Sequence, residues 1–204
     1  MIMKLVVSAT MKYRLLIISV IFLWCFPVFA QPKYEREFRI KKAEFPQEAI
    51  ALIKDEIQGV KRLRFYKEID SITIRFEAKF KKDRLFYSVE FNPEGELQDV
   101  EILIQETDIP NDAFESISGN LKETYSKFKI RKIHQQYPLT KGKERKSLLK
   151  EAFQNLLLPS INYKLIVSCK TDSGPKEFEY LFNAEGNFLS KRESLPANYD
   201  HILY

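Results

Sequence analysis

The side chains best suited to nucleophilic catalysis are few and far apart in this sequence. Cys25 lies in an apolar N-terminal run, so Cys169 is the thiol that remains for chemistry, and the two histidines are His134 and His201. A cysteine nucleophile needs a base within hydrogen-bond reach. Cys169 falls on the apolar side of an alternating stretch, where a free thiol packs as a small hydrophobe. We therefore expect a buried structural Cys169, no catalytic residues and no enzyme.

The sequence does not predict a metal site or a cofactor either. His134 and His201 share no helical or hairpin spacing, which a zinc site would need. A group of acidic residues surrounds positions 90–101, but it lacks the closely spaced oxygen ligands of a calcium-binding loop. We expect His134 at a solvated strand end and the carboxylates on an exposed edge. The acidic residues are Glu90, Glu94, Glu96, Asp99 and Glu101.

The first thirty residues have the pattern of an export signal. Residues 11–14 are a short basic start, residues 15–26 are an unbroken apolar run, and Val28 and Ala30 fit a signal-peptidase site. The apolar run is shorter than the roughly 20 residues that span a bilayer. We expect residues 1–30 to be a cleaved leader, with Met11 as an alternative start and cleavage after Ala30. The mature chain would be periplasmic or secreted, with no integral membrane segment.

Removing this leader changes the charge and the cysteine content. The net charge falls from +5 to +2, because Lys4, Lys12 and Arg14 leave with it. A value this small does not predict a nucleic-acid partner. One cysteine cannot form an internal disulfide, so the core must hold the chain together. The 16 phenylalanines and 10 tyrosines of the full sequence supply material for that core.

Two short stretches are nearly the same. Residues 91–97 read FNPEGEL and residues 182–188 read FNAEGNF. In each, asparagine opens a tight turn, and Gly95 or Gly186 supplies the left-handed residue of a type I turn with a glycine bulge. Alternating apolar residues flank both turns, so both predict the connection of a β-hairpin.

The predicted helices repeat as well. Residues 45–57 and 109–125 each begin with a proline near the first helical position, and Pro46 and Pro110 are 64 positions apart. Strand-like segments with one apolar face follow each helix. An amphipathic helix and a sheet with one apolar face are stable only when each covers the other. We therefore predict an α+β fold: a tandem repeat of one helix plus a four-stranded antiparallel sheet, with the helices on one sheet face.

The predicted boundaries are residues 31–106 for the first repeat, 107–195 for the second and 196–204 for a tail. The second repeat carries an insertion at about 138–160, whose apolar residues recur at helical spacing behind a lysine-rich start. We expect this helix to pack on the second sheet. A docking helix for a protein partner and an interfacial helix on anionic lipid are the alternatives. The residues that would carry this role are Lys146, Leu149, Phe153 and Leu157.

A proline-led helix, a strand of basic and aromatic residues and a hairpin ending in F-N-x-E-G resemble the PepSY-like domains. This exported bacterial family includes a group described as similar to the β-lactamase inhibitor protein. The resemblance covers most of residues 41–193. It implies helices on one side of a sheet and a free, often concave, opposite face in a binding or peptidase-inhibitory module. The insertion at 138–160 and the lack of the inhibitor's paired cysteines depart from that pattern. The best-matched residues are Phe91, Asn92, Gly95, Phe182, Asn183 and Gly186.

The sheet face without helices is therefore the candidate binding surface. Aromatic and arginine side chains among mixed charges suit a protein interface. We expect an exported, non-enzymatic module that binds, and could thereby inhibit, an envelope protein or peptide. The alternative is a membrane-surface or lipid-handling protein that acts through residues 141–158. The candidate binding residues are Tyr66, Arg75, Lys79, Phe86, Tyr137, Lys164, Ile166 and Leu181.

Overall fold

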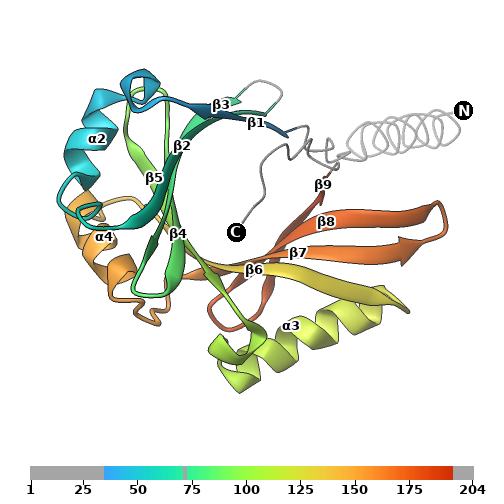
Figure 1. The fold of residues 1–204 in the computed structure, drawn as a ribbon. Helices are drawn as coiled ribbons and strands as arrows, with labels where there is room; N and C mark the ends of the chain where they lie inside the picture. The colour runs from blue at the N-terminus through green and yellow to red at the C-terminus, as the bar shows by residue number, and fades with distance from the viewer. Residues whose placement is uncertain (1–34, 71–72, 195–204) are drawn as a thin grey trace, which may run out of the picture. The chain divides into compact units, whose positions relative to one another are not determined.

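Alternating apolar and polar residues form β-strands through most of the chain. The structure, a computed structural model, describes residues 35–70 and 73–194. The predicted leader, the tail 196–204 and His201 lie outside these residues. In the described part, nine strands form one antiparallel sheet, and each strand pairs with the next along the chain (Figure 1). The strands are β1 (Glu35–Ile40), β2 (Lys61–Asp70), β3 (Thr73–Lys82), β4 (Leu85–Phe91), β5 (Leu97–Ile104), β6 (Phe128–Pro138), β7 (Asn162–Thr171), β8 (Gly174–Asn183) and β9 (Phe188–Ser194).

Three α-helices lie in the described residues: α2 (Gln47–Ile53), α3 (Asn111–Thr124) and α4 (Arg145–Phe153). The two proline-led helices are confirmed, because α2 begins directly after Pro46 and α3 directly after Pro110. The first of them is shorter than predicted. It ends at Ile53, and a turn then leads to Gly59, whose φ of +70° fits a glycine. Among the described residues, no helix is both long and apolar enough to cross a membrane.

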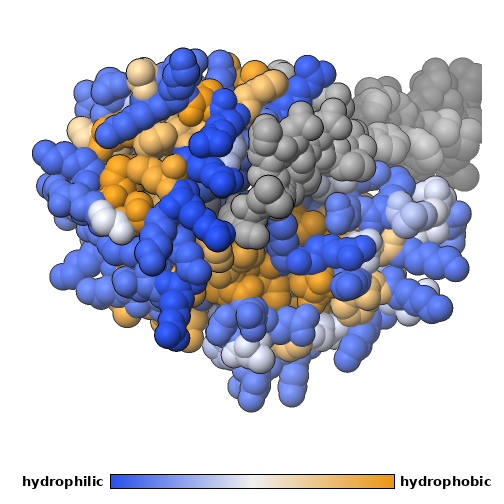
Figure 2. All heavy atoms as spheres, in the orientation of Figure 1, coloured by the Kyte–Doolittle hydropathy of each residue, from blue (hydrophilic) through white to orange (hydrophobic). Residues whose placement is uncertain are grey.

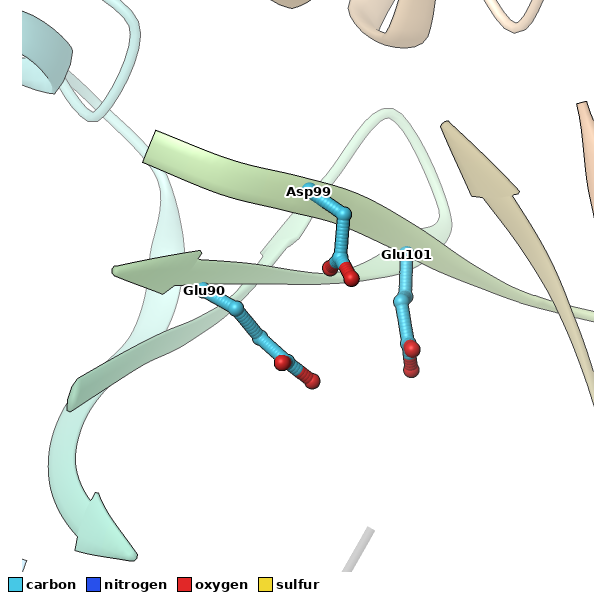
Figure 3. Close-up of side chains that lie close together, drawn as sticks. All are labelled: Glu90, Asp99 and Glu101. Carbon is cyan, nitrogen blue, oxygen red and sulfur yellow. The ribbon is translucent and has the colours of Figure 1, made fainter. Parts of the chain in front are cut away.

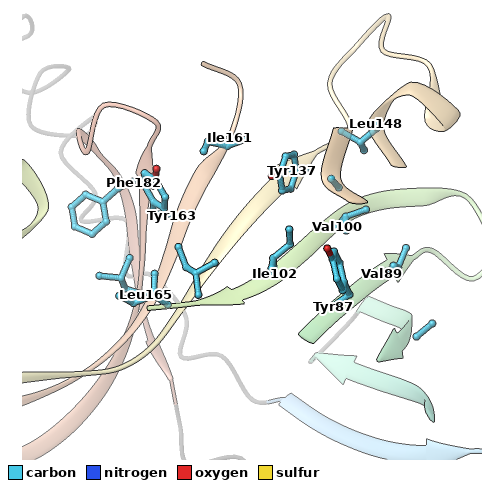
Figure 4. Close-up of a cluster of buried hydrophobic side chains, with 14 of the residues drawn as sticks. Tyr87, Val89, Val100, Ile102, Tyr137, Leu148, Ile161, Tyr163, Leu165 and Phe182 are labelled. Atoms are coloured by element: carbon cyan, nitrogen blue, oxygen red, sulfur yellow. The ribbon is translucent and has the colours of Figure 1, made fainter. Parts of the chain in front are cut away.

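All three helices lie on the same face of the sheet (Figure 1). Apolar side chains from the strands meet them there and form one continuous core, part of which is drawn in Figure 4. Burial of this apolar area supplies most of the driving force for folding. Cys169 is buried in this core, as predicted. The fully or nearly fully buried helix residues are Ala49, Ile53, Ala113, Ile117, Leu121, Leu148, Leu149 and Ala152.

The two similar turns have the same geometry, as predicted from their sequences. Asn92 accepts a backbone hydrogen bond from Gly95 at 3.0 Å, and Asn183 accepts one from Gly186 at 3.0 Å. Both glycines have a φ of +80°. Each also lies against a helix. A Cβ atom on Gly95 would come within 3.0 Å of α2, and one on Gly186 would lie 2.3 Å from the carbonyl oxygen of Ala113 in α3. Glycine is thus required both by the turn and by its contact with the helix.

The elements follow the same order in the two halves of the described chain. After the edge strand β1, the first half runs a 3₁₀ turn at Lys42–Glu44, α2, β2, β3, β4 and β5. The second runs a 3₁₀ turn at Glu106–Asp108, α3, β6, β7, β8 and β9, with α4 inserted between β6 and β7. The halves join where β5 of the first pairs with β6 of the second.

The position of α4 differs from the prediction. Its Phe153 ring lies 6.0 Å from the ring of Phe80 in β3 and 5.3 Å from that of Tyr87 in β4, measured between centroids. The expected packing on the second sheet is therefore wrong. The apolar surface of β6–β8 is already covered by α3, so the free apolar area for α4 lies over the first half (Figure 1). Leu157 does not pack and is 57% exposed.

Candidate functional site

The face of the sheet without helices gathers charged side chains from every strand. The sheet is curved (Figure 1), so Glu37 of β1 and Ser194 of β9 line the same cleft as Glu101 of the central strand β5. This cleft has a volume of about 100 Å³. The curvature also brings Arg192 of β9 within 3.8 Å of Asp70 in β2. Side chains that a flat sheet would expose to water are therefore partly buried against one another.

Most of the predicted binding residues lie on this face. The strand registers and the cleft lining place them there, and most are half-buried rather than fully exposed. Tyr66 lies on the same face but is almost completely buried, with the ammonium of Lys79 at 4.9 Å from its ring centroid. That these residues bind a partner stays a prediction. The residues placed on the helix-free face are Tyr66, Arg75, Lys79, Phe86, Lys164, Ile166 and Leu181.

Tyr137 lies on the other side of the sheet. It is 1% exposed, and its hydroxyl donates a 3.0 Å hydrogen bond to the carbonyl of Leu156, just after α4. Its expected place at the border of the helix-free face is wrong. The cause is a β-bulge between Ile130 and Lys132, which inserts one residue into β6 and reverses which later residues face the helices.

Three carboxylates point toward one another at the centre of the helix-free face (Figure 3). They belong to Glu90 of β4 and to Asp99 and Glu101 of β5. Together with Lys164 of β7 and His134 of β6 they form what we call the central charge cluster. Lys164 makes an ion pair with Glu101, and its Nζ lies 3.8 Å from Oε1 of Glu90.

Polar partners complete the cluster. His134 Nδ1 lies 2.8 Å from Oε2 of Glu101, and the side chain of Gln136 donates a 2.8 Å hydrogen bond to Asp99. The carboxylates come from β4 and β5, whereas Lys164, His134 and Gln136 come from β6 and β7. The cluster therefore joins the two halves of the sheet on the side opposite the apolar core.

Burial and charge act in opposite directions on these carboxylates. Burial alone would raise the pKa of Glu101, but Lys164 and His134 hold that pKa well below its usual range. Burial and the neighbouring Glu101 raise the pKa of Asp99 to about 7. Burial and Asp99 likewise raise the pKa of Glu90. Three carboxylates so close together cannot all ionise easily, so the proton-binding capacity of the cluster falls mainly on Asp99 and Glu90.

Further ion pairs lie on either side of the cluster. Lys79 Nζ is 3.0 Å from Glu37 and 2.9 Å from Glu77, and Ser88 donates a hydrogen bond to Glu77. Beyond Lys164 the face opens into a hollow of about 380 Å³, where Arg192 lies 2.6 Å from Glu179. The helix-free face is thus an ionic layer in which most charges have partners.

Two expectations about single residues are wrong. Glu90 and Glu101 do not lie on an exposed edge, because β4 and β5 are interior strands and Glu101 is only 3% exposed. His134 does not lie at a solvated strand end, because it is within β6 and contacts Glu101. The sequence held a signal for this site: Asp99 and Glu101 alternate on one face of a strand whose other face is apolar. The register that brings Lys164 beside them could not be read from the sequence.

The cluster has the composition of a metal site but already contains a cation. The ligand oxygens of Glu90, Asp99 and Glu101 lie within 4.8 Å of one another. Lys164 makes an ion pair with Glu101 and approaches Glu90, which is the role that a metal ion would otherwise have. We therefore interpret the group as a carboxylate cluster neutralised by an ammonium.

The geometry gives little support for catalysis. A cleft of about 100 Å³ holds a few water molecules, whereas small-molecule sites usually measure about 300–1,000 Å³. Asp99 and Glu101 have pKa values shifted in opposite directions, which is typical of acid–base pairs. The partners of both, however, are other side chains of the same cluster. Burial raises the pKa of the Cys169 thiol, which makes it a poor nucleophile.

Comparison with known proteins gives a likeness of fold. The sequence matches no family model, and no curated protein sequence is detectably similar to it. The structure matches a BLIP-like protein of Bacteroides fragilis, with 11% identity, a TM-score of 0.49, and coverage of 77% of this chain and 92% of that one. It also matches a DUF2874 family protein of Bacteroides ovatus, with 9% identity, a TM-score of 0.49, and coverage of 73% and 87%. A candidate periplasmic protein of Bacteroides eggerthii matches with 11% identity, a TM-score of 0.49, and coverage of 76% and 92%. One of these matches, the BLIP-like protein, is by its description of the group that the sequence resembles.

Replacing Lys164 tests its role as the counter-ion. In Lys164→Met, Glu90 and Glu101 lose their cation, and we expect the free energy of unfolding at pH 8 to fall by about 3 kcal/mol. Urea denaturation at pH 8 and pH 5 measures the change, which should be smaller at pH 5, where the carboxylates bind protons. Lys170→Met, which removes an exposed lysine from the same strand, is the matched control. Equal, small losses for both variants would contradict the assignment.

The raised pKa of Asp99 predicts a pH dependence of stability. The folded chain holds this proton up to a pH of about 7, whereas the unfolded chain releases it near 3.8. The stabilising contribution is therefore complete below about pH 4 and is lost as the pH rises to 7. Asp99→Asn removes this loss, so the variant should gain up to about 4 kcal/mol relative to wild type between pH 4 and pH 8. Urea denaturation across this range measures the difference. A constant difference across the range would show that Asp99 does not hold the proton.

Proposed function

We propose that the chain is an exported, non-enzymatic binding module that docks the helix-free face on an envelope protein or peptide, together with the rim of that face around Arg62, Lys81 and Phe86. One observation carries the proposal: the helices cover one face of the sheet, and side chains from both halves meet on the other face. The central cleft of about 100 Å³ holds only a few water molecules, whereas the rim is large and chemically varied. Inhibition of the partner would follow if the docked surface included the partner's own active site.

The rim has the composition of a protein interface. In the side view of Figure 2, hydrophilic side chains cover much of the molecular surface, with hydrophobic residues grouped between them. On the helix-free side, the ring of Phe86 is half-buried, with Lys81 Nζ at 4.9 Å and Arg62 Cζ at 6.0 Å from its centroid. Ile166 and Leu103 line the same cleft as Phe86. An aromatic anchor held by cations and flanked by apolar area is typical of residues that dominate binding energy.

We also infer that the two halves arose by duplication, with residues 31–106 and 107–195 as the repeats. The common order of elements and the identical φ of Gly95 and Gly186 support this inference. So does the equivalent contact of each glycine with its helix. A duplicated unit would explain why one curved sheet carries binding residues from both halves. Export is proposed from the leader pattern of residues 1–30, which lie outside the described residues.

The proposed function is tested by capturing partners from an envelope extract of the chain's own organism. Phe86→Ala should weaken binding of the captured protein by about tenfold or more, because it removes the aromatic anchor of the rim. Phe38→Ala is the matched control, since Phe38 is more exposed but belongs to the helix-covered side of β1. Titration calorimetry measures both affinities. Equal affinities for the two variants and wild type would remove the helix-free face from the proposal.

A second candidate function is contact with a membrane surface. Leu156 and Leu157, which follow α4, are 38% and 57% exposed, and Lys141, Lys146 and Lys150 before and within α4 are also exposed. Exposed leucines next to cations fit the interface of an anionic bilayer. Co-sedimentation with phosphatidylglycerol vesicles tests this, and the double variant Leu156→Ser/Leu157→Ser should then lose binding. Undiminished sedimentation of the double variant, or none of wild type, would exclude this role.

A further inference from the structure

A strongly basic cleft lies at one end of the first half of the sheet. Its volume is about 590 Å³, and it lies where β1 ends and the chain turns into the 3₁₀ segment beside β2. Four of its lining residues are cations, and its one acid, Glu44, accepts a 2.7 Å hydrogen bond from the backbone of its own turn. Among the described residues, no carboxylate lies within ion-pairing distance of the four cations. The cations are Arg39, Lys41, Lys42 and Arg64.

More positive charge lies next to this cleft. Lys61 of β2 is paired directly with Lys81 of β3. Like charges opposite each other destabilise a sheet. The helix-free face elsewhere is neutralised by ion pairs, so this end differs from the rest of the sheet in having an excess of cations. Such an arrangement becomes favourable when an anionic partner supplies the missing charge.

The backbone at this end is also unusual. A β-bulge between Lys61 and Arg64 interrupts the pairing of β2 with β3, and Arg62 there has a φ of +58°. A left-handed arginine costs free energy that the surrounding structure must offset. The bulge directs the guanidinium of Arg62 over the ring of Phe86, on the helix-free face. The basic end is thus continuous with the rim of the proposed binding surface.

The edge of β2 has no strand beside it at this end. The pairing of β1 with β2 stops at Ile40 and Phe65, so Lys61–Arg64 are paired on one side only within the described residues. An unpaired strand edge accepts an extended polypeptide through backbone hydrogen bonds. Lipid headgroups and sulfated sugars cannot pair in this way. Exposed large apolar side chains, which a membrane contact would use, do not line the cleft.

We infer that an extended acidic segment of a partner protein binds in this basic cleft, along β2. The inference rests on the proposed function, because it assigns a partner chemistry to the rim of the same face. Acidic side chains of the segment meet Arg39, Lys42 and Arg64, and its backbone pairs with Lys61–Arg64. Cations at a strand edge also discourage unwanted pairing between copies of a protein. Protection of the free edge alone does not explain the Lys61–Lys81 pair, because these two lysines face each other between β2 and β3, where the edge is already paired.

The probe is a short fluorescein-labelled peptide in which glutamate and valine alternate. Fluorescence anisotropy should give a Kd on the order of 10 µM at about 50 mM salt, weakened about tenfold at 300 mM. The double variant Arg39→Glu/Lys42→Glu should lose binding. The double variant Lys122→Glu/Lys129→Glu makes the same change in net charge at exposed lysines of α3 and β6, and should retain it. Equal binding of the peptide by both double variants would show that Arg39 and Lys42 do not bind it, and would overturn the inference.

Three further probes test whether the cleft prefers an extended acidic peptide to other anionic ligands. A version of the peptide with alternate backbone N-methyl groups should not bind, because it cannot pair with β2. A heparin fragment and phosphatidylglycerol vesicles should bind more weakly than the peptide. Full binding of the N-methylated peptide, or tighter binding of heparin or vesicles, would overturn the inference. If the peptide fails while Phe86→Ala still abolishes partner capture, the acidic segment is wrong and the proposed function stands.

Discussion

The ion pair between Lys164 and Glu101 is the interaction on which the helix-free face depends. It places one ammonium among three carboxylates that belong to two other strands. Without a cation there, the registers of β4, β5, β6 and β7 would bring together unneutralised buried charge. A buried ion pair adds little net stability compared with apolar packing, but an unpaired buried charge is strongly unfavourable. We interpret the cluster as a device that specifies how the two halves of the sheet meet.

This constraint links the two faces of the sheet. On one face the core is apolar and continuous, so it could tolerate several arrangements of the halves at similar cost. On the other face only one register pairs Lys164 with Glu101 and Gln136 with Asp99. The helix-covered face therefore supplies the free energy of folding, and the helix-free face supplies its specificity. Under the proposed function, this rigid and internally neutralised face presents fixed charges to the partner.

Much of this fold follows from local sequence. The two turns that run from Asn92 to Gly95 and from Asn183 to Gly186, and the two proline-led helices, are determined by residues that are neighbours along the chain. All four elements are found where they were predicted. Alternation also placed Arg75, Lys79 and Phe86 correctly on the helix-free face. Their partners could not be read in the same way, because they come from other strands.

The failures come from long-range effects. One inserted residue in β6 moved Tyr137 to the opposite face, and no local pattern announces such a bulge. The helix α4 packs on the first half because α3 already covers the second, which is a property of the assembled sheet. The curvature that buries Glu101 likewise depends on all nine strands together. The basic cleft was missed for a related reason: Arg39 and Arg64 lie far apart in the sequence and meet only through the pairing of β1 with β2.

The proposed function requires that partners dock on the helix-free side of the sheet. Site-specific photo-crosslinking in an envelope extract tests it directly, with the reactive group placed at position 86 in one sample and at position 122, on the exposed side of α3, in another. We expect a discrete crosslinked protein from position 86 and none from position 122. Crosslinking from position 122 alone, or equally from both positions, would contradict it.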